Sequence, residues 1–126
     1  MKRMISLLLA LLLLAGCSGN SADGAYQQIT QEAAKEMMDA QEVIILDVRE
    51  QDEYDSGHIP GAVLLPVGTI DEDTAADVIP EKDSTVLVYC RSGNRSKTAS
   101  SALADLGYTN IYEFGGITTW PYETES

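Results

Sequence analysis

The segment Cys90–Ser96, reading CRSGNRS, stands between a strand-like segment and a helical one. Residues 85–89 (TVLVY) are mostly β-branched or aromatic, and such an unbroken apolar run suits a strand covered on both faces of a parallel sheet. Apolar residues then recur at the spacing of one helix face, at Ala99, Ala102, Leu103 and Leu106. The pattern predicts a strand–loop–helix unit in which Cys90 lies at the carboxyl end of a strand, beside a helix N-terminus. In α/β sheets that crevice binds ligands, and the helix dipole favours an anion there.

The rest of the chain continues this alternation of short strands and helices. Further strands are expected at 43–46, 62–65 and 111–114, and further helices at 30–40, capped by Thr30, and at 71–79. Gly115 and Gly116 are interpreted as a tight turn, followed by a helical turn at 117–120. Strands that alternate with helices predict an α/β fold built on a largely parallel sheet.

The N-terminal segment has the pattern of an export signal. Lys2 and Arg3 precede the apolar run 5–15, whose eleven residues are too few for a transmembrane helix, which needs ~20. The run closes on LAGC, which resembles the lipobox of bacterial lipoproteins, where the cysteine, here Cys17, is lipidated and becomes the new N-terminus. An ordinary secretory signal cut near Ala15 is the alternative. The predicted division is a lipoprotein signal peptide at 1–16, a lipidated N-terminus and flexible linker at 17–25, and one domain at 26–126.

Lipidation of Cys17, by acyl chains such as palmitate, predicts a protein of the bacterial cell envelope, anchored to a membrane on its extracytoplasmic side. It also leaves Cys90 without a disulfide partner in the chain. Without Lys2 and Arg3, six cations face twenty acids, a formal charge of −14, which argues against nucleic acid and against electrostatic adhesion to anionic lipid. Three of those six cations follow Cys90 within eight residues and favour a small anionic ligand there: Arg91, Arg95 and Lys97.

The residues around Cys90 suit a reactive thiolate. A helix N-terminus and nearby arginines lower a cysteine's pKa, and the thiolate is the nucleophilic form. Gly93 can turn successive N–H groups inward as an anion-binding nest, and Asn94 tolerates left-handed geometry. Ser92 and Ser96 add hydroxyl donors, and Ser96 can also cap the helix. A buried and inert cysteine is the alternative.

Other conspicuous residues receive structural interpretations. The acidic residues within 50–55 lack the spacing of a calcium loop and are interpreted as a solvated face. His58, the only histidine, is expected to fix a glycine-rich turn. Asp47 and Arg49 are expected to pair or cap near the edge of the sheet, and an ordering role around the Cys90 loop is the alternative. Trp120 is expected to fill the core. No pattern in the sequence predicts a metal site or a nucleotide cofactor.

Several separated motifs resemble the single-domain form of the rhodanese family. They are DVRE (47–50), Glu53 and Tyr54, GHIPGA (57–62), YCRSGNRS (89–96), and GY (107–108) followed by Gly115, Gly116 and Trp120. The resemblance covers nearly the whole of 26–126. It implies a rhodanese-like fold, with a small, mainly parallel five-stranded sheet and helices on both faces.

The resemblance further implies a thiosulfate sulfurtransferase that works through a persulfide and needs no cofactor. In that chemistry the Cys90 thiolate attacks the outer sulfur of thiosulfate, sulfite leaves, and the sulfur passes to cyanide or to a thiol acceptor. Cys90 would be the catalytic nucleophile. The substrate-binding residues would be Arg91, Ser92, Gly93, Asn94, Arg95 and Ser96, with backbone N–H groups around the persulfide and the two arginines holding the anionic donor.

Two alternatives stay open. Phosphatases that use a cysteine place five residues between the cysteine and an arginine, whereas four residues separate Cys90 from Arg95. This spacing favours sulfur transfer and leaves a phosphatase or an arsenate reductase as the less favoured alternative. The other alternative is a non-enzymatic rhodanese module, which carries persulfide sulfur or binds a redox or sulfur-relay protein. The retained Cys90 counts against a module that only binds a partner, but not against a sulfur carrier.

Overall fold

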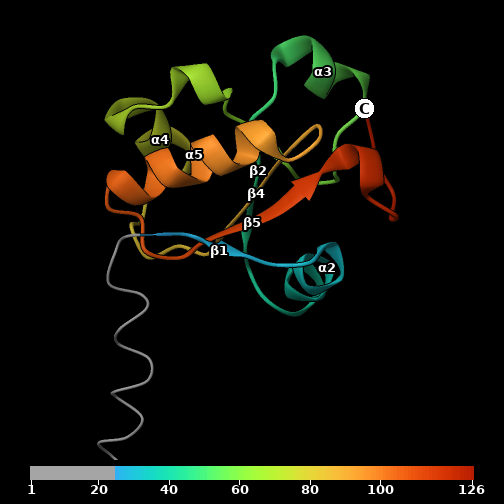
Figure 1. Ribbon diagram of the computed structural model, residues 1–126, viewed down its shortest axis with the longest axis horizontal. Helices are drawn as coiled ribbons and strands as arrows, with labels where there is room; N and C mark the ends of the chain where they lie inside the picture. Colours follow the sequence, from blue (N-terminus) through green and yellow to red (C-terminus); the bar gives the residue numbers. More distant parts are fainter. Residues whose placement is uncertain (1–24) are drawn as a thin grey trace, which may run out of the picture.

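The computed structural model describes residues 25–126 (Figure 1). The predicted signal peptide, Cys17 and the linker up to residue 24 lie outside the described residues. The elements follow one another as β1 (Gln27–Gln28), α2 (Gln31–Ala40), β2 (Ile44–Asp47), α3 (Gln51–Ser56), β3 (Val63–Leu64), η1 (Val67–Thr69), α4 (Glu72–Val78), β4 (Val86–Cys90), α5 (Asn94–Asp105), β5 (Ile111–Gly116) and η2 (Ile117–Thr119).

The five strands form one parallel sheet in the order β1-β5-β4-β2-β3, which confirms the predicted α/β class. Strand β4 lies at the centre, between β2 and β5, and all its residues are buried. This burial on both faces explains the unbroken apolar run of 85–89. Strand β1 was not predicted, because its two residues are exposed glutamines without an apolar pattern.

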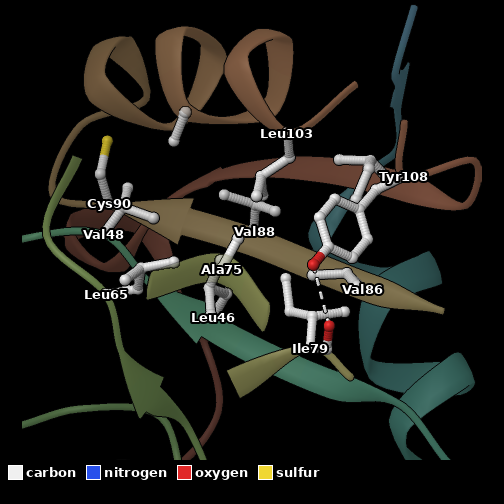
Figure 2. Packing of buried hydrophobic residues seen from close by; sticks show 12 residues of the cluster. Leu46, Val48, Leu65, Ala75, Ile79, Val86, Val88, Cys90, Leu103 and Tyr108 are labelled. Carbon is white, nitrogen blue, oxygen red and sulfur yellow. Dashed lines mark hydrogen bonds between the residues drawn. The ribbon is translucent and has the colours of Figure 1, made fainter. Parts of the chain in front are cut away.

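Helices cover both faces of the sheet, as predicted (Figure 1). On one face the sheet packs against α4 and α5, which contribute Ala75, Ala99 and Leu103 to the core. Figure 2 shows this cluster, with the Tyr108 hydroxyl donating to the Ile79 carbonyl at 2.9 Å. On the other face α2 contributes Ala34 to a second buried cluster. The remaining members of that cluster are Ile45, Ile59, Ala62, Leu87, Tyr89, Phe114 and Trp120, which confirms Trp120 as a core residue.

Two helix starts follow the expected capping chemistry and one does not. Thr30 caps α2 by accepting the Ala33 N–H at 3.0 Å, as predicted, and Asp71 caps α4. Helix α5, in contrast, is preceded by Gly93 at φ +110°, and begins at Asn94. The predictions of Ser96 as a cap and of left-handed geometry at Asn94 are therefore wrong. Glycine adopts a positive φ at little cost, so the chain turns at Gly93 and the helix starts before Ser96.

A buried ion pair lies at the carboxyl end of β2. Arg49 Nη2 lies 2.7 Å from Asp47 Oδ2, and the two side chains are almost completely buried. The Tyr89 hydroxyl donates to the same carboxylate oxygen at 2.6 Å, and Arg49 Nη2 donates to the Gly57 carbonyl at 2.7 Å. The expected pairing of Asp47 with Arg49 is confirmed, and the Tyr89 hydroxyl connects it to the residue before Cys90.

Candidate active site

Cys90 is the last residue of β4 and is 1% exposed. Its Sγ accepts the backbone N–H of Gly93 at 3.0 Å and lies 3.4 Å from the Ser96 hydroxyl. Figure 2 shows the sulfur turned toward α5. The thiol therefore lies where a parallel strand ends and a helix begins, as the sequence predicts, with N–H donors directed at its sulfur.

The surroundings of Cys90 stabilise the thiolate. Burial raises the pKa of the thiol, because the charged form loses hydration. Hydrogen bonding with the Ser96 hydroxyl, and hydrogen bonds from the backbone N–H groups of Ser96, Gly93 and Ser92, outweigh that effect, so the pKa lies below its ordinary value. The site therefore carries more nucleophilic thiolate near neutral pH than an isolated cysteine would.

The loop after Cys90 is held against β5 and η2. Thr118 donates to the Arg91 carbonyl through its backbone N–H at 3.2 Å and through its hydroxyl at 3.0 Å. Gly116 lies in register with Cys90, and a Cβ atom on Gly116 would overlap the Arg91 carbonyl. The predicted tight turn at Gly115 and Gly116 is wrong, since both belong to β5. Gly116 is needed instead for the close approach of two backbone segments.

We expect Gly116→Ala to destabilise the domain by about 1–3 kcal/mol and to slow the reaction of Cys90 with iodoacetamide, because the added methyl must displace the Arg91 backbone. The matched control is Gly68→Ala, where an added Cβ meets nothing within 4 Å and the residue has no positive φ. Urea unfolding and the rate of iodoacetamide reaction with Cys90 measure both effects. Equal unfolding midpoints for the two variants would contradict the close packing of this loop.

The charged residues of the segment have different surroundings. The side chains of Arg91 and Lys97 are exposed, whereas Arg95 is half-buried and forms a two-pronged pair with Glu53 of α3, at 2.8 and 2.9 Å. The Arg95 hydrogen bond lowers the pKa of the Glu53 carboxyl to about 2, against the opposing effect of partial burial. The interpretation of 50–55 as a solvated face is therefore wrong for Glu53. The pair leaves Arg95 partly neutralised and Arg91 as the exposed arginine beside Cys90.

The other loop residues that were predicted to bind substrate differ in their exposure. Ser92 and Asn94 have exposed side chains, and Gly93 and Ser96 are buried. A surface hollow of about 320 Å³ lies against the loop and is lined in part by Ser92, Gly93, Lys97 and Glu113. Backbone N–H groups, rather than the side chains of Ser92 and Asn94, therefore face the sulfur.

Sequence reasoning missed Glu113 of β5, which is 2% exposed. Its Oε2 accepts the Ser96 hydroxyl at 2.5 Å and the Gly115 N–H at 3.0 Å, and its Oε1 accepts the Gln28 amide at 3.2 Å. The available signal was a glutamate inside the apolar run 111–114, since a charged residue in a buried strand requires specific partners.

His58 has the structural role expected for it. Its Nδ1 lies 2.9 Å from the Tyr54 carbonyl, and its ring stacks on the Tyr54 ring at a centroid distance of 3.8 Å. Backbone hydrogen bonds with Glu125 attach the C-terminal segment to this turn. Within residues 25–126 no group of three or more His, Cys, Asp or Glu residues could hold a metal ion. Over the same range, no helix has the length and apolar character needed to cross a membrane.

Residues 30–122 match the family model of the rhodanese-like domain. The chain belongs to the rhodanese-like family. Residues 1–18 match the prokaryotic membrane lipoprotein lipid attachment site, which supports the interpretation of the lipobox. The rhodanese-like match includes both the ion pair of β2 and the Cys90 loop.

Relatives of this rhodanese-like chain bear names from sulfur chemistry. The thiosulfate sulfurtransferase GlpE of Coxiella burnetii is 33% identical over 96 residues, which cover 75% of this chain and 87% of that protein. The putative sulfur carrier protein YrkF of Bacillus subtilis is 35% identical over 100 residues, which cover 78% of this chain and 52% of that protein. A solved structure described as rhodanese with anions from E. coli superposes with a TM-score of 0.63 at 29% identity, covering 68% of this chain and 99% of that one. These relatives support rhodanese-type sulfur transfer at the level of the family.

Proposed function

We propose that this protein is a thiosulfate sulfurtransferase that carries sulfane sulfur on Cys90. The observation that carries the proposal is the position of Cys90 Sγ, at a strand end, with the Gly93 N–H directed at it from 3.0 Å. The lowered pKa of the thiol supplies the nucleophile, and the same N–H groups can accept the negative charge of a terminal sulfur.

The proposed reaction has two transfers. The Cys90 thiolate attacks the outer sulfur of thiosulfate, a new S–S bond forms, the S–S bond of thiosulfate breaks, and sulfite leaves with the bonding electrons. Cyanide or a thiolate then attacks the terminal sulfur and leaves Cys90 as a thiolate again. The backbone N–H groups of 91–96 hold the terminal sulfur, and Arg91, which is exposed, attracts the anionic donor more than Arg95, which is paired with Glu53.

The assay that tests this function follows thiocyanate formation from thiosulfate and cyanide by the purified domain. Sustained thiocyanate formation supports an enzyme. A single loading of Cys90 without turnover would favour the carrier alternative, for which the likeness to a putative sulfur carrier of Bacillus subtilis is the specific observation. Phosphate release from an aryl phosphate, without sulfur transfer, would overturn both.

We also propose that Cys17 is the lipid anchor that holds this activity at a bacterial membrane on its extracytoplasmic side. The match of 1–18 to the lipoprotein attachment site supports it. Lipidation joins Cys17 to acyl chains, whose burial in a bilayer contributes about 0.8 kcal/mol per CH₂ group.

In cells that express the full chain, we expect Cys17→Ala to abolish incorporation of labelled palmitate and to move the protein out of the membrane fraction. Ser18→Ala, at the neighbouring position, is the matched control and should keep both properties. A Cys17→Ala variant that is still labelled with palmitate and sediments wholly with membranes would contradict anchoring through this residue.

A further inference from the structure

The Ser96 hydroxyl lies between two groups that compete for its single proton. Its Oγ is 3.4 Å from Cys90 Sγ and 2.5 Å from Glu113 Oε2. In the structure the Cys90 thiol donates to Ser96, and Ser96 donates to Glu113. Ser96 can therefore stabilise a Cys90 thiolate only if Glu113 no longer needs the hydroxyl proton.

Glu113 is held by neutral donors. Its hydrogen-bond partners are Ser96, Gly115 and Gln28, and no Lys, Arg or His within residues 25–126 forms an ion pair with it. Of the charged groups in this region, exposed Lys97 of α5 lines the same hollow as Glu113. In the Cys90 loop and at the start of α5, Arg91 is exposed and Arg95 is paired with Glu53 of α3. Strand β1 and helix α2 contribute the neutral Gln28 and Gln31 to that hollow.

A thiolate and a carboxylate so close together, both buried, oppose each other's ionisation. Cys90 is 1% exposed and Glu113 is 2% exposed, so water screens their charges little. Two such groups favour sharing one proton over carrying two negative charges. The hydroxyl of Ser96 supplies the path by which that proton can change sides.

We infer that Glu113 is a positioning residue that takes up the Cys90 proton through Ser96, an inference that rests on the proposed role of Cys90 as nucleophile. The thiol proton passes from Sγ to Ser96 Oγ, while the hydroxyl proton of Ser96 passes to Glu113 Oε2. Afterwards protonated Glu113 donates to Ser96, and Ser96 donates to the thiolate. One S–H bond breaks, one O–H bond of a carboxyl group forms, and the net charge of the buried site does not change.

The substitution Glu113→Gln tests this path. The backbone Gly115 N–H, which donates to Oε2, favours the orientation of the new amide in which its oxygen faces Ser96. The Gln28 amide, which donates to Oε1, belongs to an exposed residue and can turn its own oxygen toward the new NH2 group. An amide oxygen accepts the Ser96 proton but cannot return one, so the thiolate loses both its proton acceptor and the Ser96 hydrogen bond. We expect the pH midpoint of Cys90 alkylation by iodoacetamide to rise by about one unit, which is about tenfold less thiolate at pH values below both midpoints.

Two controls separate this path from a simple charge effect. Glu36→Gln, on the exposed face of α2, removes the same charge elsewhere and should leave the midpoint unchanged. In a Ser96→Ala background, which lacks the connecting hydroxyl, Glu113→Gln should cause no further rise. A lowered midpoint in Glu113→Gln with Ser96 present would overturn the inference, because it would mean that Glu113 only repels the thiolate.

A second measurement needs no change at Glu113. In the infrared spectrum at neutral pH, the wild-type protein should show a protonated carboxyl band that is absent from Cys90→Ser, and the lack of such a band in the wild type would overturn the inference. Alkylation and infrared spectra both report on Cys90 and Glu113 without a sulfur donor. If no thiocyanate forms but Glu113→Gln still raises the pH midpoint of Cys90 alkylation, the proposed function alone is rejected. If sulfur transfer is normal but that midpoint does not rise, the proton path alone is rejected.

Discussion

Cys90→Ser is expected to abolish thiocyanate formation from thiosulfate and cyanide, with a loss of at least about 10³-fold, while the domain stays folded. A serine hydroxyl is a poor nucleophile at neutral pH, and it cannot hold sulfane sulfur as a persulfide. The smaller Oγ still accepts the Gly93 N–H, so the loop keeps its hydrogen bond. The rate of thiocyanate formation and the thermal unfolding midpoint separate the loss of chemistry from a loss of structure.

The matched control for Cys90→Ser is Ser101→Ala, a small substitution at an exposed position of α5. It should keep the wild-type rate and the wild-type unfolding midpoint. A Cys90→Ser variant that forms thiocyanate as fast as this control would rule out the proposed mechanism.

The second large effect concerns stability and should follow from Asp47→Ala. This change leaves the buried Arg49 guanidinium without its carboxylate and removes the acceptor of the Tyr89 hydroxyl. We expect the free energy of unfolding to fall by about 3–5 kcal/mol, as for other buried ion pairs that lose one partner. Urea unfolding at neutral pH measures it.

The chain offers an exposed ion pair as the control for Asp47→Ala. Lys35 and Asp39 lie four residues apart on α2, at 2.9 Å, and the Asp39 side chain is 63% exposed. Solvent screens such a pair, so Asp39→Ala should change the unfolding midpoint little. If both substitutions shift the midpoint equally, the Asp47–Arg49 pair does not support the end of β4 as described.

The local pattern of the sequence predicts the frame of the site. The apolar run 85–89 and the helical spacing after it locate β4 and α5, because the spacing of apolar residues in a single strand or helix can be recognised from consecutive residues. The start of α5 is harder to predict, since Gly93, Asn94 and Ser96 can each begin a helix in isolation. Only the packing of the loop decides among them in favour of Gly93.

Contacts between distant elements could not be predicted from these patterns. Arg95 pairs with Glu53, which is 42 positions away, and Ser96 contacts Glu113, which is 17 positions away. No rule of sequence spacing predicts either contact, since both depend on the order of the strands in the sheet and on the register of β5 against β4. The sequence thus points to Cys90 as the proposed nucleophile, whereas the structure shows which groups contact Ser96 and Arg95 beside it.

The most direct test of Cys90 as a sulfur carrier is the mass of the protein after incubation with thiosulfate. Intact-mass and peptide spectra of the wild-type domain should show the addition of one sulfur atom, on the peptide that contains Cys90, and its loss after cyanide is added. The Cys90→Ser variant should gain nothing under the same conditions. A wild-type protein that gains no sulfur, or a Cys90→Ser variant that gains it, would contradict the proposal that Cys90 carries the transferred sulfur.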